Sequence, residues 1–411
     1  MQIAAASALD GPGFEDPGFE DRRARRNALR LAAAQALAGA NATVVFATGA
    51  IVGATLAPDK ALATMPISMF VVGMAAGTLP TGWIAHRFGR RAAFVAGSGI
   101  GCVAGLVASA ALLVGSFPLY CAATFLAGLY GAVVQSFRFA AADGASAAFR
   151  PRALSWVMAG GVFSGVLGPQ LVTWTMDLWQ PYLFAASYLA QAAVALIAMA
   201  VLSGVDLPRP QRAQRAGRPL LEIIRQKRFI VAALCGVVTY CLMNLVMTSA
   251  PLAMRLCGLP LWASNATIQW HVVAMYGPSF FTGAIITRFG APRVVAAGLA
   301  LLAGAAVIGL SGISLPHFTV GLILLGIGWN FGFVGASALV LETHRPEERT
   351  RVQSFNDFLV FGTMAVGSFS SGQVLIVFGW AAVNWIVFPP VVIGLAALQL
   401  TGALARRPRP A

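Results

Sequence analysis

Three methionines and one histidine occur as two closely spaced pairs in a strongly apolar part of the chain. Met243 and Met247 are four residues apart, and His271 and Met275 repeat that spacing on the next apolar segment. On a helix this spacing places both side chains of a pair on one face. Two adjacent antiparallel helices could therefore present three thioethers and an imidazole to one point. Such neutral, soft donors suit Cu(I), whereas Mg²⁺ and Ca²⁺ require oxygen ligands.

Further sulfur atoms extend this arc along the same helix. At about 100° per residue, Met254 and Cys257 fall on the side of Met243, and Cys235 lies at the margin of that side. The pattern predicts a ladder of soft atoms leading to the copper site. Core packing is the competing interpretation, because methionine commonly fills irregular cores. A histidine within the membrane is more informative, since a polar group at that depth is costly without a partner.

The elements that must position these residues are membrane helices. The chain has 411 residues, 58% hydrophobic and 10% charged, with a mean hydropathy of +0.77. Apolar runs of about 20 residues recur along it, and such runs cross a bilayer as helices because each backbone polar group must be satisfied internally. We expect an all-α polytopic membrane protein with twelve transmembrane helices. The expected spans are about 29–56, 61–85, 92–115, 117–140, 152–178, 180–203, 229–256, 260–287, 293–314, 316–342, 352–378 and 380–404.

The net charge of +14 reflects membrane orientation and not nucleic-acid binding. All but three of the 28 Lys and Arg residues lie before the first span, in alternate short loops or in the tail, and the exceptions are Lys60, Arg138 and Arg255. Basic loops mark the cytoplasmic side. We therefore expect a multi-pass protein of the bacterial inner membrane with both termini in the cytoplasm. Five cysteines without a CxxC pair do not indicate a disulfide framework.

The expected domains follow from the charge pattern. Residues 1–27, in which PGFED occurs twice, form a disordered cytoplasmic tail; residues 28–203 and 229–405 form two six-helix halves; residues 204–228 form a basic cytoplasmic linker; and residues 406–411 form a basic tail. Internal repetition supports the two halves. Thr81-Gly82 followed by Arg87-Phe88-Gly89 recurs as Thr282-Gly283 followed by Arg288-Phe289-Gly290, an offset of 201.

The loop after the second span carries a resemblance to a known family. Its sequence from Gly82 to Arg91, GWIAHRFGRR, resembles the GxxxDRxGRR signature of the major facilitator superfamily, with His86 where aspartate is usual. The resemblance implies two halves that rock about a site near the midplane. It also implies a gating role for these residues. Asp357, near the cytoplasmic end of the eleventh span, is expected from its position to form a structural ion pair or a gate. The expected gating residues are Gly82, His86, Arg87, Gly89, Arg90, Arg91 and Asp357.

A second resemblance concerns the substrate. The pairs MNLVM (Met243 to Met247) and HVVAM (His271 to Met275) are similar to the MxxxM and HxxxM motifs of the CcoA-like copper importers, a bacterial branch of the superfamily. This implies copper as the transported substrate at these four positions, import into the cytoplasm and supply of cbb3-type cytochrome c oxidase assembly. It implies no permanently bound cofactor. The periplasmic donor and cytoplasmic acceptor of the metal stay unassigned.

Two other functions remain open at this point. In a transporter of an organic solute or drug, Trp270, Tyr276, Trp329 and Asn330 would line the cavity while the methionines pack. A membrane copper-binding or oxidase-assembly factor would bind the metal without moving it. An enzyme is not expected, because no nucleophile, base and orienting group occur together.

Overall fold

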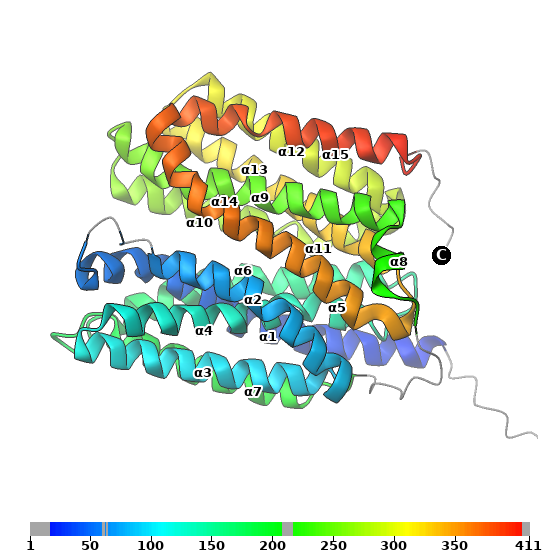
Figure 1. Cartoon of the computed structure of the whole chain (residues 1–411), viewed down its shortest axis with the longest axis horizontal. Coiled ribbons are helices and arrows are strands. Elements are labelled where there is room, and N and C mark those ends of the chain that lie inside the picture. The colour runs from blue at the N-terminus through cyan, green and yellow to red at the C-terminus, as the bar shows by residue number, and fades with distance from the viewer. Residues whose placement is uncertain (1–16, 60–61, 63–64, 208–216, 405–411) are drawn as a thin grey trace, which may run out of the picture.

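The protein is a bundle of helices whose axes run in a common direction, as seen in the computed structural model (Figure 1). The structure describes residues 17–59, 62, 65–207 and 217–404. Within these ranges every regular element is a helix. In lipid this is the expected result, because a helix satisfies its backbone N–H and C=O groups within one segment. The predicted all-α membrane fold is confirmed.

The N-terminal half contains six membrane crossings, the fourth of which continues into a short helix. Its helices are α1 (Pro17–Leu56), α2 (Met65–Phe88), α3 (Arg90–Val114), α4 (Phe117–Gln135), α5 (Phe137–Ala142), α6 (Arg150–Thr175) and α7 (Ala185–Ser203). A short helix in the linker, α8 (Leu220–Ile224), leads to the C-terminal half. That half contains α9 (Lys227–Leu256), α10 (Leu261–Tyr276), α11 (Ser279–Phe289), α12 (Ala291–Ser311), α13 (Leu315–Leu341), α14 (Arg349–Trp385) and α15 (Phe388–Leu400), with a 3-10 turn η2 (Pro346–Glu348) before α14.

Ten of the described helical segments are long and apolar enough to cross a membrane on their own. The expected eighth span is divided into α10 and α11 at Gly277 and Pro278. The expected eleventh span is the part of α14 before Gly379, where a φ of 79° kinks the helix before the twelfth. Both breaks occur at glycine or proline, the residues that least tolerate a continuous helix.

The structure differs from the expected N-terminal tail. Residues 1–16 lie outside the described part of the chain, but α1 already begins at Pro17. Its first turns are held by the end of the N-terminal half: Arg23 forms an ion pair with Asp206, and the Asn27 amide donates to the Asp206 carbonyl at 2.5 Å. The expected 406–411 tail also lies outside the described residues, as does 208–216 of the linker.

The two halves lie side by side, the N-terminal half below the C-terminal half in Figure 1. Helix α14 of the C-terminal half packs along α2, and α10 and α11 pack against α6. The largest hydrophobic core cluster crosses this boundary, because Phe70, Met74 and Met158 of the first half belong to it together with residues of α9 to α14. This part of the interface between the halves is therefore packed and apolar.

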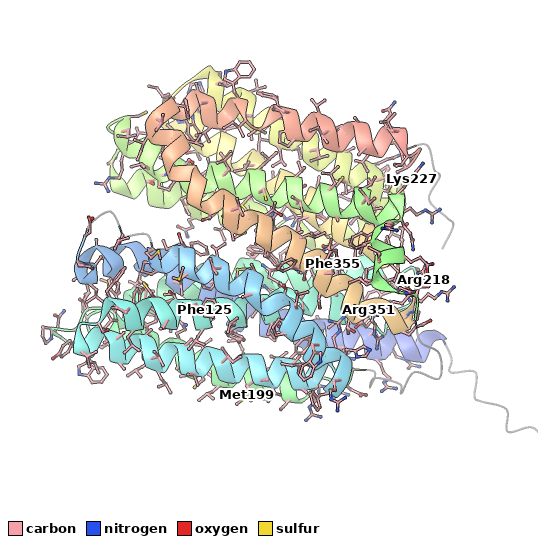
Figure 2. The ribbon with its side chains drawn as sticks, viewed as in Figure 1. Phe125, Met199, Arg218, Lys227, Arg351 and Phe355 are labelled. Carbon is pink, nitrogen blue, oxygen red and sulfur yellow. The ribbon has the colours of Figure 1, made fainter. Side chains whose placement is uncertain are left out.

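One end of the bundle carries most of the charge, and we call it the basic end. The start of α1, helix α8 and the end of α15 lie there (Figure 1), as do Arg218, Lys227 and Arg351 (Figure 2). Arg218 binds both carboxylate oxygens of Glu348 at 2.9 and 2.8 Å, and Arg351 donates to the Arg218 carbonyl. These bonds attach the end of the linker to the loop between α13 and α14.

Candidate functional site

The four expected copper ligands all lie in the interior of the C-terminal half. Met243 and Met275 are buried, and Met247 packs against the same main core cluster as both of them. His271 is fully buried. The three thioethers are thus part of a continuous apolar core, which is the packing role that methionine commonly fills.

The imidazole of His271 is held by a helix other than the one that carries Met243 and Met247. Its Nδ1 lies 2.7 Å from the carbonyl oxygen of Leu322 on α13. Helix α10 also approaches α13 closely, because a Cβ added at Gly326 would lie 2.7 Å from the His271 carbonyl oxygen. The Nε2 of His271 is buried and has no hydrogen-bond partner among the described residues. The bond to Leu322 therefore joins α10 to α13.

The outer sulfur atoms fall into different environments. Met254 and Cys235 are fully buried, whereas Cys257 is exposed just beyond the end of α9. In the described ranges no three His, Cys, Asp or Glu side chains are grouped so that they could hold a metal ion. Burial of Met254 and Cys235 in the core does not require them to bind a metal. The ladder of sulfur ligands therefore stays a prediction.

A cluster of five aromatic rings occupies the middle of the C-terminal half, and we call it the aromatic cluster. Tyr240 of α9 meets Trp329, Phe333 and Phe361 edge-on, with ring centroids 5.6, 5.0 and 5.3 Å away. Trp329 stacks on Phe333 at 5.2 Å, and Tyr276 of α10 meets Trp329 at 5.5 Å. Rings from four helices, α9, α10, α13 and α14, thus pack together, and three of them contact Trp329.

The aromatic cluster borders the interface between the halves. On one side, the ring of Tyr276 lies on Gly161 of α6, where an added Cβ would be 2.5 Å from its Cε1. On another, the Nε2 of Gln135, the last residue of α4, donates to the Tyr240 hydroxyl at 3.4 Å. Tyr240 and Trp329 lie near the middle of α9 and α13, and Tyr276 is the last residue of α10, at the break before α11. A midplane position between the halves is where a transporter of two rocking halves binds its substrate.

Asn330 fixes the break between α10 and α11 beside this cluster. Its amide nitrogen donates to the Met275 carbonyl at 2.6 Å and to the Ser279 hydroxyl at 2.5 Å, while its carbonyl oxygen accepts from Thr282 at 2.7 Å. The Met275 carbonyl, which lies next to the break, thus accepts a hydrogen bond from a side chain. Asn330 is thus a structural anchor, and Trp270 is 58% exposed on the surface of α10. Of the four residues expected to line an organic-solute cavity, Tyr276 and Trp329 belong to the aromatic cluster.

A buried ion pair closes the aromatic cluster toward the basic end. Arg138 of α5 lies 2.5 Å from Asp357 of α14 and donates from Nε to Ser337 at 3.2 Å. Its guanidinium also faces the rings of Phe139 and Phe333 at 4.3 and 4.6 Å. Since Arg138 belongs to the first half and Asp357 to the second, this pair ties the halves together. Asp357 is the expected gating residue of the eleventh span.

In the loop from Gly82 to Arg91, some of the expected gating residues contact the other half and others are exposed. Arg90 forms an ion pair with Asp143 at 2.6 Å and donates to Gln353 of α14. Gly82 packs against Ser354, where a Cβ would meet the Ser354 Cβ at 2.5 Å, and Gly89 has a φ of 90° between α2 and α3. The side chains of His86, Arg87 and Arg91 are exposed. Gating by these residues stays a prediction, with Arg90 and Gly82 in contact with the other half.

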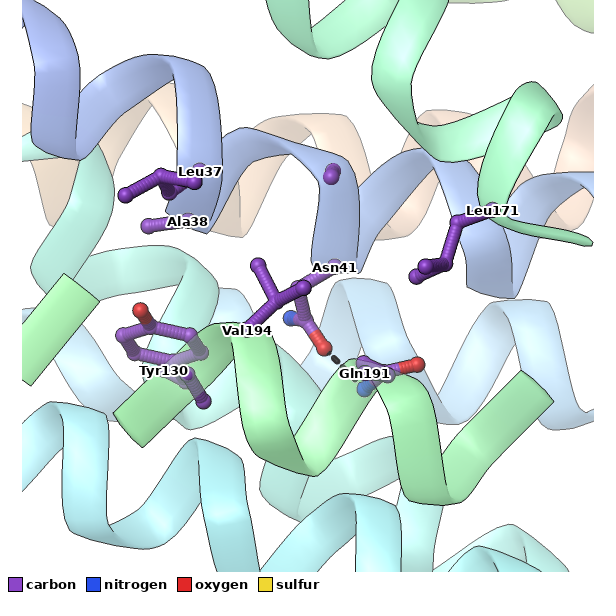
Figure 3. Close-up of a pocket in the computed structure, with 9 residues that line it drawn as sticks. Leu37, Ala38, Asn41, Tyr130, Leu171, Gln191 and Val194 are labelled. Atoms are coloured by element: carbon purple, nitrogen blue, oxygen red, sulfur yellow. Dashed lines mark hydrogen bonds between the residues drawn. The ribbon is translucent and has the colours of Figure 1, made fainter. Parts of the chain in front are cut away.

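A narrow pocket that has no room for a water molecule lies within the N-terminal half (Figure 3). Helices α1, α4, α6 and α7 line it, and in it the Gln191 amide donates to the Asn41 carbonyl oxygen. Asn41 in turn donates to the Ala127 carbonyl at 3.2 Å. These two bonds join α1, α4 and α7, while the Tyr130 hydroxyl and the Gln191 side-chain oxygen have no hydrogen-bond partner among the described residues.

Comparison with known proteins settles the family. Residues 31–277 and 263–411 match the sequence model of the Major Facilitator Superfamily. The chain belongs to the major facilitator superfamily. It is therefore a transporter of this superfamily and not an enzyme. Its fold of two helical halves, and the resemblance of the loop from Gly82 to Arg91, agree with this assignment.

One relative of this superfamily member is similar over nearly its whole length. This chain is 46% identical to "Riboflavin transporter RfnT" of Brucella anthropi over 381 residues, which is 92% of this chain and 96% of that protein. Among solved structures, the human organic anion transporter MFSD10 has a TM-score of 0.72 at 16% identity, and a bacterial homologue of the iron transporter ferroportin has 0.69 at 12%. These alignments cover 92% of this chain and 99% and 100% of the others, and they show the fold.

These comparisons do not support the substrate expected from the sequence. The copper-importer branch is not supported, because the relative with 46% identity is named for an organic solute. The MxxxM and HxxxM motifs do not by themselves establish a metal site, because four-residue spacing fixes which residues share a face but not which neighbour that face meets. In the structure, His271 meets α13. Four residues of the aromatic cluster and its border were not identified from the sequence, and these are Gln135, Tyr240, Phe333 and Phe361. Tyr276 and Trp329, which belong to the same cluster, were identified.

Proposed function

We propose that this protein carries an uncharged, planar aromatic solute of the riboflavin class into a bacterium across its cytoplasmic membrane. The observation that carries the proposal is the 46% identity to a riboflavin transporter, which extends over 92% of the chain. Similarity of that extent covers both halves and all the helices that border the interface. The proposal replaces copper, for which the argument rests on four residues alone.

The aromatic cluster supports this choice of solute. Small-molecule sites are mostly apolar and aromatic, with a few polar groups that fix the orientation of the ligand. A three-ring flavin offers a flat face to stack on Tyr240, Trp329 or Phe333, and rings stack or meet edge-on at centroid distances of about 4.5–7 Å. The rings of the cluster already lie at such distances from one another.

Transport by this superfamily member would proceed by rocking of the halves about the interface. In the structure the basic end is closed: α14 packs on α2, and the pairs Arg138–Asp357 and Arg90–Gln353 span the halves. Because basic residues gather on the cytoplasmic side, we place this end in the cytoplasm together with both termini. Solute would then enter from the opposite side before these contacts separate.

Uptake of labelled riboflavin by a bacterial strain that cannot synthesise it tests the proposal. Cells that express the full chain should accumulate riboflavin and grow on low external concentrations. Trp329→Ala, which removes the central ring of the cluster, should abolish uptake, whereas Trp270→Ala, which removes an exposed ring on α10, should not. Both variants must reach the membrane in equal amounts.

The same cells test the copper alternative. Radioactive copper uptake would be compared for the wild-type chain and for Met247→Ala and His271→Ala. Copper accumulation that these substitutions abolish, together with no riboflavin uptake, would overturn the proposal in favour of metal transport. Riboflavin uptake that is unaffected by Met247→Ala would support it and assign the methionine to packing.

A further inference from the structure

We propose that Gln135, Tyr240 and Trp329 form a polar subsite that recognises an imide edge of the transported ring. An imide edge is the side of a heterocycle at which one N–H lies between two carbonyl groups, as it does in flavins. This inference rests on the proposed function, and it adds to that function the residues that select the substrate.

Gln135 and Tyr240 face each other across the two halves. Gln135 ends α4 in the first half, and Tyr240 lies on α9 in the second. Their hydrogen bond is long, at 3.4 Å, and it is the single one that the Gln135 side chain forms with the described residues. The amide oxygen and the second amide hydrogen of Gln135 are therefore available to a ligand. The Tyr240 hydroxyl accepts in this bond and keeps its own hydrogen to donate.

Trp329 supplies a second, independent sign of a missing ligand. Its side chain is fully buried, and its Nε1–H has no hydrogen-bond partner in the part of the chain that the structure describes. A buried donor without a partner is costly, so such groups are rare in native proteins and call for an explanation. The indole is confined by Tyr240, Tyr276 and Phe333, so it cannot turn away to find a partner.

The hydrogen-bonding groups of these three residues complement an imide edge. A primary amide can accept from the imide N–H and donate to the adjacent carbonyl at the same time. The Tyr240 hydroxyl and the Trp329 Nε1–H are two further donors for the carbonyl oxygens. All three groups are uncharged. The nearby charges do not take part, because Arg138 and Asp357 are paired with each other.

The position of the subsite also connects recognition to movement. Since Gln135 comes from the first half and Tyr240 and Trp329 come from the second, a ligand bound by all three joins the halves around itself. A ligand without the imide N–H would leave the Gln135 carbonyl oxygen unpaired after the site closes. Sites built to bind a polar group discriminate against analogues that lack it for this reason.

Flavin binding to the purified full-length protein in detergent tests the subsite. The probes are riboflavin and N3-methylriboflavin, in which a methyl group replaces the imide hydrogen, and binding is followed by quenching of flavin fluorescence. One hydrogen bond corresponds to about a threefold to tenfold change in affinity. We expect the wild-type protein to bind the methylated flavin at least about tenfold more weakly, because the methyl group removes a bond and adds bulk.

Two substitutions assign the effect to residues. Gln135→Ala should weaken riboflavin binding by about threefold to tenfold and leave N3-methylriboflavin binding nearly unchanged, so that discrimination is lost. Trp329→Phe retains an aromatic ring and removes the N–H, and should weaken both flavins to a similar extent. Gln170→Ala removes an exposed amide on α6 and should preserve both affinities and their ratio.

The outcomes separate the subsite from the proposed function. Equal wild-type affinity for the two flavins, or unchanged discrimination in Gln135→Ala, would overturn the imide subsite while riboflavin binding itself still stands. No riboflavin binding by the wild-type protein would overturn the proposed function. The comparison of the two flavins on the wild-type chain requires no variant, so misfolding of a substituted protein does not prevent the test.

Discussion

Arg138 is the residue whose charge is hardest to accommodate in this protein. It is 1% exposed and lies within the membrane part of the fold, where an uncompensated guanidinium would be very costly. Asp357, Ser337 and the rings of Phe139 and Phe333 together compensate it. Three of these four residues belong to the second half. Separation of the halves at the basic end must therefore remove most of the groups that stabilise this cation.

The first prediction concerns this ion pair. Asp357→Asn keeps the size of the side chain but leaves the Arg138 charge unpaired, which should destabilise the protein by about 3–5 kcal/mol. Thermal unfolding in detergent would measure the loss. The double variant Arg138→Gln with Asp357→Asn should recover much of it, because both charges are then removed. If the double variant loses as much stability as the two single variants combined, the two side chains do not interact directly.

At the scale of helices, the glycine face of α6 decides how closely the halves approach. Gly161 accepts the ring of Tyr276 from α10, and Gly165 accepts Val272, where an added Cβ would lie 2.6 Å from its Cγ1. Small residues let helix backbones approach closely in membranes. This interface also supports the aromatic cluster, because Tyr276 lies between Gly161 and Trp329.

The second prediction follows from that contact. Gly161→Ala should push the Tyr276 ring off α6, cost about 1–3 kcal/mol through overpacking, and reduce riboflavin binding. Gly99→Ala on α3 is the matched control, since a Cβ there has no neighbour within 4 Å and alanine favours a helix. Flavin fluorescence and thermal unfolding would be compared for both variants. Equal behaviour of the two would show that the α6 contact does not position Tyr276.

The third prediction concerns the connection of the linker to the second half. The Arg218 guanidinium, hydrogen-bonded to the carboxylate, lowers the pKa of Glu348 from 4.5 to about 2. Because the folded pKa is the lower one, this contribution to stability is complete above about pH 4.5 and is lost as the pH falls toward 2.

Glu348→Gln should therefore flatten the loss of thermal stability between pH 5 and pH 3, approximate limits set by these pKa values. Hydrogen exchange at α8 at neutral pH is the second measurement, and it should be faster in the variant because Arg218 no longer meets a charge. A wild-type acid profile that the substitution leaves unchanged would mean that the Arg218–Glu348 pair does not hold the linker.

The helices themselves could be predicted from the sequence, whereas their mutual orientation could not. Long apolar runs determine where segments cross a bilayer, so each expected span overlaps one helix or two consecutive helices, while α8 lies in the linker. The break at Gly277 and Pro278 fell inside an expected span, because glycine and proline also occur in continuous membrane helices. The start of α1 at Pro17 depends on Asp206, which is distant in sequence.

For the whole molecule, the site depends on contacts that no local pattern contains. The aromatic cluster combines rings from α9, α10, α13 and α14, and its polar partner Gln135 comes from the other half. Each of these residues is unremarkable in its own segment. The expected copper site combined His271 with residues of two neighbouring segments, α9 and α10. In the structure the imidazole instead bonds to α13, which is more distant in the sequence.

The distribution of charge over the whole protein leads to the last prediction, which concerns phosphorylated flavins. Of the three basic residues outside the cytoplasmic loops and termini, Arg255 is exposed near the end of α9 and Arg138 is paired with Asp357, while Lys60 lies outside the described residues. A flavin phosphate that enters between the halves would meet no free cation among the described residues of the aromatic cluster and its border.

Riboflavin 5′-phosphate should accordingly compete with labelled riboflavin roughly a hundredfold less well than riboflavin does, because burying an unpaired charge costs several kcal/mol. Uptake into cells or vesicles in the presence of each competitor measures this ratio. Asp357→Asn frees the Arg138 cation, which lies against Phe333 at the edge of the aromatic cluster. This variant should reduce the difference between riboflavin and riboflavin 5′-phosphate as competitors. Equal competition by the two compounds in the wild-type protein would mean that a cation outside this cluster neutralises the phosphate. A narrower ratio in the variant would place the phosphorylated end of the solute on the Arg138 side.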